Sequence, residues 1–348
     1  DYIALGCMSG TSLDGIDLSL IRSDGETYSE EIMNYFQPYS KDLKDKLHEV
    51  IRSGYLTDPK IASQLSVEYS RTIQQFLDSN KKYSVNIIGI HGQTVFHDEK
   101  TKISIQLFDK NLNLNISIPV ICNFRKNDLL NGGFGAPIIP IYHQLIHHKL
   151  NKKSSVFVNI GGVTNITVIN QEGIFAGDTS FGNALVNDLI WKKFNFEMDE
   201  DGYISGKGIV NDSIIDLVLS DPFFSRSLPK TLDRNYFHKY LEQLQAMDKT
   251  ENIINSLLEI VPISIQKLIF DTDPTIILCG GGRKNLTLQK LFRKHFKDVH
   301  SIDEYGLDGD YIESQGMALL SIRYLMRKKS TFTSTTGVKR EVYLGERC

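Results

Sequence analysis

Apolar and polar residues alternate along the first part of the chain, on either side of a polar turn. Residues 2–5 are apolar, residues 6–15 contain three glycines among hydroxyl and carboxylate side chains, and residues 16–21 alternate apolar and polar residues. Alternation with a period of about two is typical of a half-buried strand, and no helical period of about 3.6 is present. The beginning of the chain therefore predicts a strand, a tight polar turn and a second strand.

The same pattern returns in the middle of the chain. Residues 154–169 again read as an apolar strand, a polar glycine turn and an alternating strand. Two such units, about half a chain apart, predict an internally duplicated fold. A third glycine turn differs, because in residues 275–292 a buried-type strand and three glycines lead into a helical pattern from about Leu286. Residues 85–98 predict another strand, ending in a polar glycine turn.

Helical periods fill much of the remaining sequence. Amphipathic helices are predicted at residues 43–52, 61–79, 183–194 and 312–329. Helices and strands in alternation define an α/β protein, and 348 residues are too many for one ordinary core. Residues 134–142, with two prolines, are the predicted junction between two lobes, and residues 330–348 predict a loop with a short strand.

Composition narrows the range of partners. The chain is 41% hydrophobic with a net charge of -3, and no basic face dominates, so nucleic acid is not an expected partner. No apolar run approaches the roughly 18 residues of a membrane span, and no signal peptide is visible, so no membrane partner is expected. The four cysteines form no C-x-x-C pair, which predicts neither a zinc site nor a disulfide framework and favours a reducing compartment.

The glycine turns suit a polyphosphate ligand. Glycine lets the backbone approach closely, hydroxyls donate to phosphate oxygens, and a carboxylate can hold Mg²⁺ directly or through water. A single turn of this kind is equally a plain hairpin, but three together predict a nucleotide site. Neither a P-loop, which needs G-K-[ST], nor a G-x-G-x-x-G fingerprint is present. The candidate nucleotide-binding residues are Gly10, Thr11, Ser12, Asp14, Gly15, Asp17, Gly161, Gly162, Thr164, Asn165, Gly280, Gly281 and Gly282, with Asp14 and Asp17 as candidate Mg²⁺ ligands.

The motifs resemble those of anhydro-N-acetylmuramic acid kinases, within the larger superfamily of sugar kinases, actin and Hsp70 chaperones. The likeness covers nearly the whole chain in order and spacing. It rests on "MSGTSLDGID" (8–17), "HGQTV" (91–95), "NFRKNDLLNGGFGAP" (123–137), "VNIGGVTNIT" (158–167), "GDTSFGNALVND" (177–188), "PKTLDRNYF" (229–237), "CGGGRKN" (279–285) and "YIESQGMAL" (311–319).

This resemblance implies a duplicated two-lobe actin-like ATPase fold, with ATP and Mg²⁺ in a cleft between the lobes. We expect lobe I to comprise residues 1–130 and about 318–348, and lobe II residues 131–317. The implied reaction uses water and ATP to open 1,6-anhydro-N-acetylmuramic acid and yields N-acetylmuramic acid 6-phosphate. The implied setting is cytoplasmic cell-wall recycling by a homodimer.

The resemblance also assigns roles to individual residues. Asp178 matches the catalytic base, which must take a proton from water as it attacks the anomeric carbon; the alternative is an N-cap for the following helix. Glu313, Arg125 and Thr94 match substrate-side motifs. Lys230 and Arg234 can meet a carboxylate or phosphate, although a surface role is equally open. His91 is either a general acid or base or a hydrogen-bonding scaffold.

Two stretches depart from the family pattern. Ser180 and Phe181 stand where glycine and proline are usual, so the turn beside Asp178 loses a fixed proline. Phe134 replaces a glutamine, which removes an amide donor and acceptor. These departures bear on rate and substrate rather than on the type of reaction.

Other classes of function are left open by the residues. A kinase for another anhydrosugar, such as levoglucosan, shares the motifs but needs no group for the lactyl carboxylate. An ATP-gated protein of the actin or chaperone kind needs no base beside a sugar, and Asp178 and Glu313 count against it. A glycine-rich α/β hydrolase lacks its G-x-S-x-G turn here.

Overall fold

The chain forms two compact units. The structure is a computed structural model that describes residues 1–10, 12–53, 60–98, 101–108, 117–269 and 273–348. The first unit comprises Asp1–Lys149 and Tyr311–Cys348, and the second comprises Leu150–Asp310. The chain therefore leaves the first unit once and returns to it near its C-terminal end.

We expected the boundaries between the units after residue 130 and at about residue 318, and the observed boundaries lie elsewhere. Residues 134–142 belong within the first unit and not at a junction. Tyr142 donates a hydrogen bond to Gln315, and Ile139 lies so close to Gly316 that a Cβ there would be 2.7 Å from it. These contacts join residues 139–142 to the start of α10 (Ile312–Leu325), so both segments belong to the first unit.

The first unit is built on a seven-stranded sheet. Its strands are β1 (Tyr2–Ser9), β2 (Gly15–Ser23), β3 (Ser29–Pro38), β4 (Ile87–Asp98), β5 (Ile103–Leu107), β6 (Val120–Cys122) and β12 (Glu346–Arg347). Its helices are α1 (Lys41–Ser53), α2 (Lys60–Ser79), α3 (Lys126–Leu130), α4 (Pro140–Leu150), α10 (Ile312–Leu325) and α11 (Thr333–Thr336).

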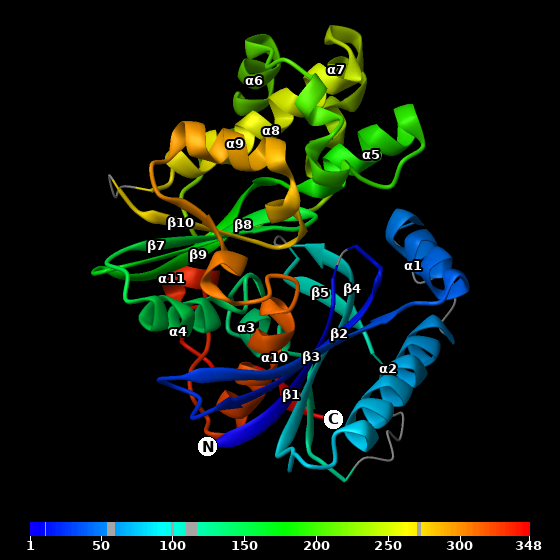
Figure 1. Ribbon diagram of the computed structural model, residues 1–348, viewed down its shortest axis with the longest axis vertical. Coiled ribbons are helices and arrows are strands. Elements are labelled where there is room, and N and C mark those ends of the chain that lie inside the picture. Colours follow the sequence, from blue (N-terminus) through cyan, green and yellow to red (C-terminus); the bar gives the residue numbers. More distant parts are fainter. Residues whose placement is uncertain (11, 54–59, 99–100, 109–116, 270–272) are drawn as a thin grey trace. The chain divides into compact units, whose positions relative to one another are not determined.

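The second unit is built on a five-stranded sheet. Its strands are β7 (Ser155–Ile160), β8 (Val163–Asn170), β9 (Gly173–Phe181), β10 (Thr275–Cys279) and β11 (Val299–Ser301). Its α-helices are α5 (Asn183–Phe194), α6 (Asp212–Leu219), α7 (Leu241–Met247), α8 (Thr250–Gln266) and α9 (Leu286–His295), and Figure 1 shows them gathered over one face of that sheet. Short 3-10 helices are η1 (Glu200–Gly202), η2 (Ser205–Lys207), η3 (Pro222–Ser225), η4 (Tyr236–Tyr240), η5 (Gly281–Lys284) and η6 (Ile302–Tyr305).

The two sheets share one strand order, which confirms the predicted duplication. The order β3-β2-β1-β4-β6 in the first unit matches β9-β8-β7-β10-β11 in the second. In both, the first three strands are antiparallel and the next two run parallel to the first. The two predicted hairpins, β1–β2 and β7–β8, occupy equivalent places.

Strand β2 is buried on both faces, although its alternation predicts a half-buried strand. Leu18 and Leu20 face a core that α1 and α2 complete, and Ser19 faces α10, where its hydroxyl bonds that of Ser314 at 2.6 Å. Gly6 permits this packing, since a Cβ there would lie 1.9 Å from the Ser314 carbonyl oxygen. A helix almost 300 residues away in sequence therefore buries a position that looks solvent-facing.

Two other expectations are wrong in detail. Strand β4 does not end at the glycine within residues 91–95. Gly92 adopts a φ of 79°, and the strand continues past it to Asp98, paired with β5. Cys122 and Cys348 form a disulfide, with Cα atoms 6.1 Å apart, where β12 pairs with β6. No local spacing signals a bond between residues 226 positions apart. Among the described residues, no helix is long and apolar enough to cross a membrane.

Candidate active site

The turn between β1 and β2 presents an exposed hydroxyl and carboxylate. Ser12 donates to Asp14 Oδ1 at 2.7 Å, and both side chains are exposed. Buried Leu13, with a φ of 58°, anchors the turn, and the amide of Gln93 donates to the Gly10 carbonyl at 3.0 Å. Thr11 lies outside the described residues. Leu13 and Gln93 thus fix this turn, while the side chains of Ser12 and Asp14 are exposed to solvent.

Gly15 and Asp17 belong to strand β2 rather than to the turn. A Cβ on Gly15 would lie 2.3 Å from the Gln37 carbonyl oxygen, so close packing of β3 already requires a glycine there. Asp17 is half-buried and pairs in register with Met8 and Phe36. Of the two candidate Mg²⁺ ligands, Asp14 is the more exposed.

A buried hydroxyl cluster supports this end of β1, and no sequence motif indicated it. Ser9 Oγ bonds the hydroxyl of Tyr39 at 2.6 Å and also that of Tyr69. The Tyr39 backbone N–H donates to the Asp14 carbonyl at 2.9 Å. Burial raises the pKa of both tyrosines, so both hydroxyls stay protonated and hold the turn.

The second hairpin carries a polar row across three strands. Asn159 on β7 pairs with Asn165 on β8, which pairs with Asp178 on β9. Directly paired residues share one face of a sheet, so the three side chains lie side by side. Asn159 was not predicted as a site residue. It also abuts the third glycine turn, because a Cβ on Gly280 would lie 2.4 Å from Asn159 Oδ1.

The turn of the second hairpin receives the start of α5. The Gly161 carbonyl accepts from Asn183 N–H at 2.7 Å, and the Gly162 carbonyl accepts from Gly182 N–H at 3.1 Å. Thr164, by contrast, is buried, and its hydroxyl donates to the Phe181 carbonyl at 2.9 Å. The turn is therefore fixed by backbone contacts with residues that directly follow β9.

Asp178 lies within β9 and is not a helix N-cap. Helix α5 begins at Asn183, and its N-cap is Gly182. The Asp178 side chain is 8% exposed, and its Oδ2 accepts from the Leu232 backbone N–H at 2.7 Å. Its own N–H donates to the Lys230 carbonyl at 2.8 Å. Asp178 is thus a buried carboxylate fixed by the segment that contains the 229–237 motif.

Lys230 and Arg234 occupy different environments. Lys230 is 1% exposed, and its Nζ donates to the Phe223 carbonyl at 3.0 Å, which excludes the surface role considered for it. Arg234 is half-buried, and its Nε has no hydrogen-bond partner among the described residues. Arg234 therefore keeps donor capacity for a ligand, whereas the Lys230 amine is buried and bonded to the Phe223 carbonyl.

The third glycine turn is mainly a packing device with one open position. Gly280 has a φ of 70°, and a Cβ on Gly282 would lie 2.3 Å from the Ile160 side chain. A Cβ on Gly281 would meet nothing within 4 Å. Buried Arg283 holds the turn through a bidentate ion pair with Asp303, at 2.7 and 3.1 Å. Of the three glycines, Gly281 is the one that offers bare backbone to a ligand.

On the first unit, Arg125 is held by His91. Arg125 Nε donates to His91 Nε2 at 3.1 Å, and His91 Nδ1 lies 2.8 Å from the Gly92 carbonyl. A carbonyl accepts only from N–H, so Nδ1 carries the proton and Nε2 accepts. Burial, and then the charge of Arg125, lower the pKa of His91 to about 3. His91 is therefore a neutral scaffold that orients Arg125.

The remaining substrate-side candidates lie nearby in sequence or at the start of α10. Thr94 Oγ1 accepts from the Gln106 amide at 3.3 Å. Glu313 is half-buried in the first turn of α10. Each of these groups belongs to the first unit, while Asp178 and the second and third glycine turns belong to the second.

Both departures from the family pattern are accommodated by packing. Phe181 is 1% exposed, and its ring packs edge-on against Phe237, with centroids 5.3 Å apart, so core burial fixes the turn beside Asp178. Phe134 lies beneath the Lys102 ammonium, 3.7 Å from its ring centroid, and against Gly337. An aromatic face thus occupies the place of the usual amide.

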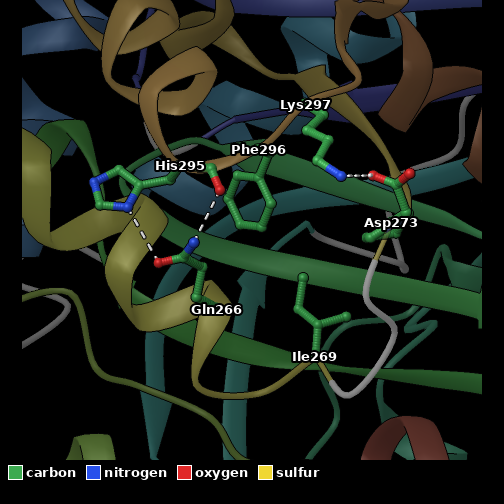
Figure 2. Close-up of a pocket in the computed structure, with 7 residues that line it drawn as sticks. Gln266, Ile269, Asp273, His295, Phe296 and Lys297 are labelled. Carbon is green, nitrogen blue, oxygen red and sulfur yellow. Dashed lines mark hydrogen bonds and ion pairs between the residues drawn. The ribbon is translucent and has the colours of Figure 1, made fainter.

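A pocket of about 260 Å³ lies away from these residues (Figure 2). Its lining comes from the ends of α8 and α9 and from residues just before β10 and β11, including Gln266, His295 and Lys297. The second and third glycine turns instead follow the carboxyl ends of β7 and β10, where ligands of such sheets bind. Figure 2 shows Gln266 and His295 bonded to each other, so the pocket's polar groups are largely satisfied.

In the described part of the chain, no three His, Cys, Asp or Glu side chains lie close enough together to hold a metal ion.

The duplicated sheets and their polar hairpin turns define the fold class of the protein. Two copies of one strand order, each with such a turn between its first two strands, are the fold of sugar kinases, actin and Hsp70 chaperones. The family model described as anhydro-N-acetylmuramic acid kinase matches residues 2–347. The chain therefore belongs to the anhydro-N-acetylmuramic acid kinase family and is a kinase.

Individual relatives agree with this assignment. The protein named anhydro-N-acetylmuramic acid kinase in Pelagibacter ubique is 34% identical to this chain, and the match covers 97% of this chain and 96% of the relative. The protein of the same name in Haemophilus influenzae is 32% identical to this chain, and the match covers 98% of this chain and 96% of the relative. Among solved structures, component A of (R)-2-hydroxyglutaryl-CoA dehydratase from Acidaminococcus fermentans is 11% identical, with a TM-score of 0.48 over 94% of this chain and 100% of that chain. The assignment to the family rests on the sequence relatives and the family model.

Proposed function

We propose that the protein uses ATP and water to open 1,6-anhydro-N-acetylmuramic acid and to phosphorylate it to N-acetylmuramic acid 6-phosphate. The observation that carries the proposal is Asp178, a buried carboxylate held by Leu232 N–H and in register with Asn165. A carboxylate fixed in this way is suited to take a proton from one attacking water. Membership of the family supplies the substrate class.

The nucleotide-side residues fit a polyphosphate. ATP supplies the phosphoryl group, and Mg²⁺ neutralises charge on its phosphates. Exposed Ser12 and Asp14 present a donor and a carboxylate, and the open Gly281 backbone permits close approach. Mg²⁺ keeps several waters and binds through one or two carboxylates. Asp14 is our first candidate ligand and Asp17 our second.

The substrate-side residues supply charge of the right sign. Arg125 is oriented by neutral His91, and Arg234 retains an unbonded Nε among the described residues. A guanidinium recognises a planar carboxylate with two parallel hydrogen bonds, so one of these two arginines is proposed to bind the lactyl group. Glu313 and Thr94 are proposed to bind sugar hydroxyls. We further propose that the protein acts in the cytoplasm in peptidoglycan recycling, and that it works as a homodimer.

Levoglucosan phosphorylation is the second candidate, and Phe134 is the observation that favours it. Phenylalanine has neither the donor nor the acceptor that a side-chain amide could offer to an acetamido or lactyl group, and levoglucosan has neither group. The test is mass spectrometry of anhydrosugars and open-ring sugars incubated with ATP. The proposal requires 1,6-anhydro-N-acetylmuramic acid to gain one water and one phosphoryl group. Preference for levoglucosan would select the second candidate, and ATP hydrolysis without any sugar product would indicate an actin-like or chaperone-like protein.

A further inference from the structure

Asp178 is held by one short segment of the second unit. The Lys230 carbonyl accepts from Asp178 N–H at 2.8 Å, and Leu232 N–H donates to Asp178 Oδ2 at 2.7 Å. Gly177 allows this approach, since a Cβ there would lie 2.9 Å from both the Lys230 nitrogen and oxygen. The position of the carboxylate therefore depends on where residues 230–232 lie.

The side chain of Lys230 fastens this segment to η3. Its Nζ donates to the Phe223 carbonyl at 3.0 Å and lies 4.2 Å from the centroid of the Phe223 ring. Both contacts are with neutral groups. A buried ammonium is costly unless a negative charge compensates it, and Asp178 supplies a negative charge that acts on Lys230.

We propose that Lys230 is a positioning residue for the catalytic base: its side chain fastens residues 230–232 to η3, the backbone of these residues holds Asp178, and its buried ammonium favours the ionised form of that carboxylate. The inference rests on the proposed function for the role of Asp178. We prefer it to direct binding of substrate by Lys230, because that side chain is 1% exposed and bonded to Phe223.

Charged side chains on two neighbouring segments act on Lys230. Asp178 from β9 attracts it, and Arg226, which directly follows η3, repels it. Asp221, before η3, is paired with Lys239, and the cross-strand neighbour of Asp178 on β8 is the neutral Asn165. Burial first, and then Arg226, lower the pKa of Lys230 to about 8, against the effect of Asp178. At neutral pH the amine thus remains mostly charged.

The test is the titration of Asp178 in the whole protein. Carboxyl-¹³C aspartate labelling gives its NMR resonance, which Asp178→Asn assigns by its disappearance. In wild type we expect this resonance to respond near pH 8, where Lys230 loses its proton, in addition to the titration of Asp178 itself. In Lys230→Met the response near pH 8 should vanish, and the titration of Asp178 should move to higher pH, because an attractive neighbouring charge is lost. The acid limb of kcat/KM should move with it.

Lys239→Met is the matched control. Lys239 also lies over an aromatic ring, 3.9 Å from the Tyr236 centroid, but its partner is Asp221. The Asp178 titration should not change in this variant. An unchanged Asp178 titration in folded Lys230→Met would overturn the inference. If that variant does not fold, absence of the response near pH 8 in wild type would overturn it too. The titration needs no turnover, so it separates this inference from a failure of the proposed reaction.

Discussion

Asp178→Asn separates the chemistry of the base from its structural place. The asparagine keeps the shape of the side chain, and its oxygen can still accept from Leu232 N–H, which lies 2.7 Å from Oδ2 in the wild type. An acceptor that loses its charge weakens such a bond by about 1 kcal/mol, and the buried Lys230 amine, with a pKa of about 8, can give up its proton once Asp178 is neutral, so the variant should fold. The amide cannot take a proton from water, so turnover should fall by about 10²–10⁴, or roughly 3–5 kcal/mol in the barrier.

The assay is turnover of the anhydrosugar in oxygen-18 water. Attack of water on the anomeric carbon places the label in the anomeric hydroxyl, read promptly before exchange. The phosphate stays unlabelled, because its bridging oxygen comes from the sugar. Asp233→Asn is the control, since it neutralises an exposed carboxylate of the same segment that bonds only locally to Asn235 N–H, at 2.8 Å, in the interactions recorded for it. Turnover by Asp178→Asn within about tenfold of wild type would remove the base assignment, and label in the phosphate would indicate plain ATP hydrolysis.

Four further outcomes are expected. Phe181→Ala should lower the free energy of unfolding by about 3–5 kcal/mol, measured in denaturant, because a fully buried ring is lost; a cost below about 1 kcal/mol would contradict its role as the anchor of this turn. Gly280→Ala should lower the free energy of unfolding by about 2 kcal/mol or more, since the φ of Gly280 is 70° and a Cβ would strike Asn159. Gly281→Ala should change that free energy by less than about 0.5 kcal/mol and should weaken ATP binding. A larger loss of stability in Gly281→Ala than in Gly280→Ala would refute this interpretation of the turn. Hydrogen bonds with Glu304 and Asp298 raise the pKa of His300, although burial opposes them, so its contribution is present below about pH 6.5 and fades as the pH rises through the raised value. Wild type and His300→Gln should accordingly differ more in unfolding free energy at pH 5.5 than at pH 8, and a pH-independent difference would exclude this linkage. Magnesium-ATP at about a hundredfold excess over its Kd should add roughly 2–3 kcal/mol to the free energy of unfolding, and no thermal shift with any nucleotide would rule out the nucleotide site.

Local pattern was sufficient for the two hairpins, for the four amphipathic helices it predicted and for the duplication. The helix predicted at residues 183–194 is α5 with the same ends, because apolar residues at helical spacing are flanked by glycine before and a left-handed asparagine after. The hairpins at residues 2–21 and 154–169 follow from alternation around glycine turns. The helix predicted at residues 312–329 ends earlier, at Leu325, because Arg327 takes a positive φ.

Motif order also led to the family, but it did not tell which residues of a motif face a ligand. Gly15, Gly280 and Gly282 look like ligand-binding glycines, yet neighbouring strands or side chains occupy the space that a Cβ would need. Lys230 looks like an exposed cation and is buried. A sequence motif records that a residue type is required, while only the packing around it shows the reason.

Contacts between residues far apart in sequence could be found only in the folded chain. Ser19 is buried because α10 covers it, and Cys122 bonds Cys348 because β12 returns to β6. Asp178 meets Leu232 and Lys230 across more than fifty positions, which turns a possible helix cap into a fixed carboxylate.

The strands, the turns and the family were readable before folding was considered, since they arise from short-range periodicity and from residue type. Burial, partners and charge environment arise instead from contacts that form only when distant segments pack together. Such contacts gave Asp178, His91 and Lys230 their separate roles, as a fixed carboxylate, a neutral scaffold and a buried ammonium.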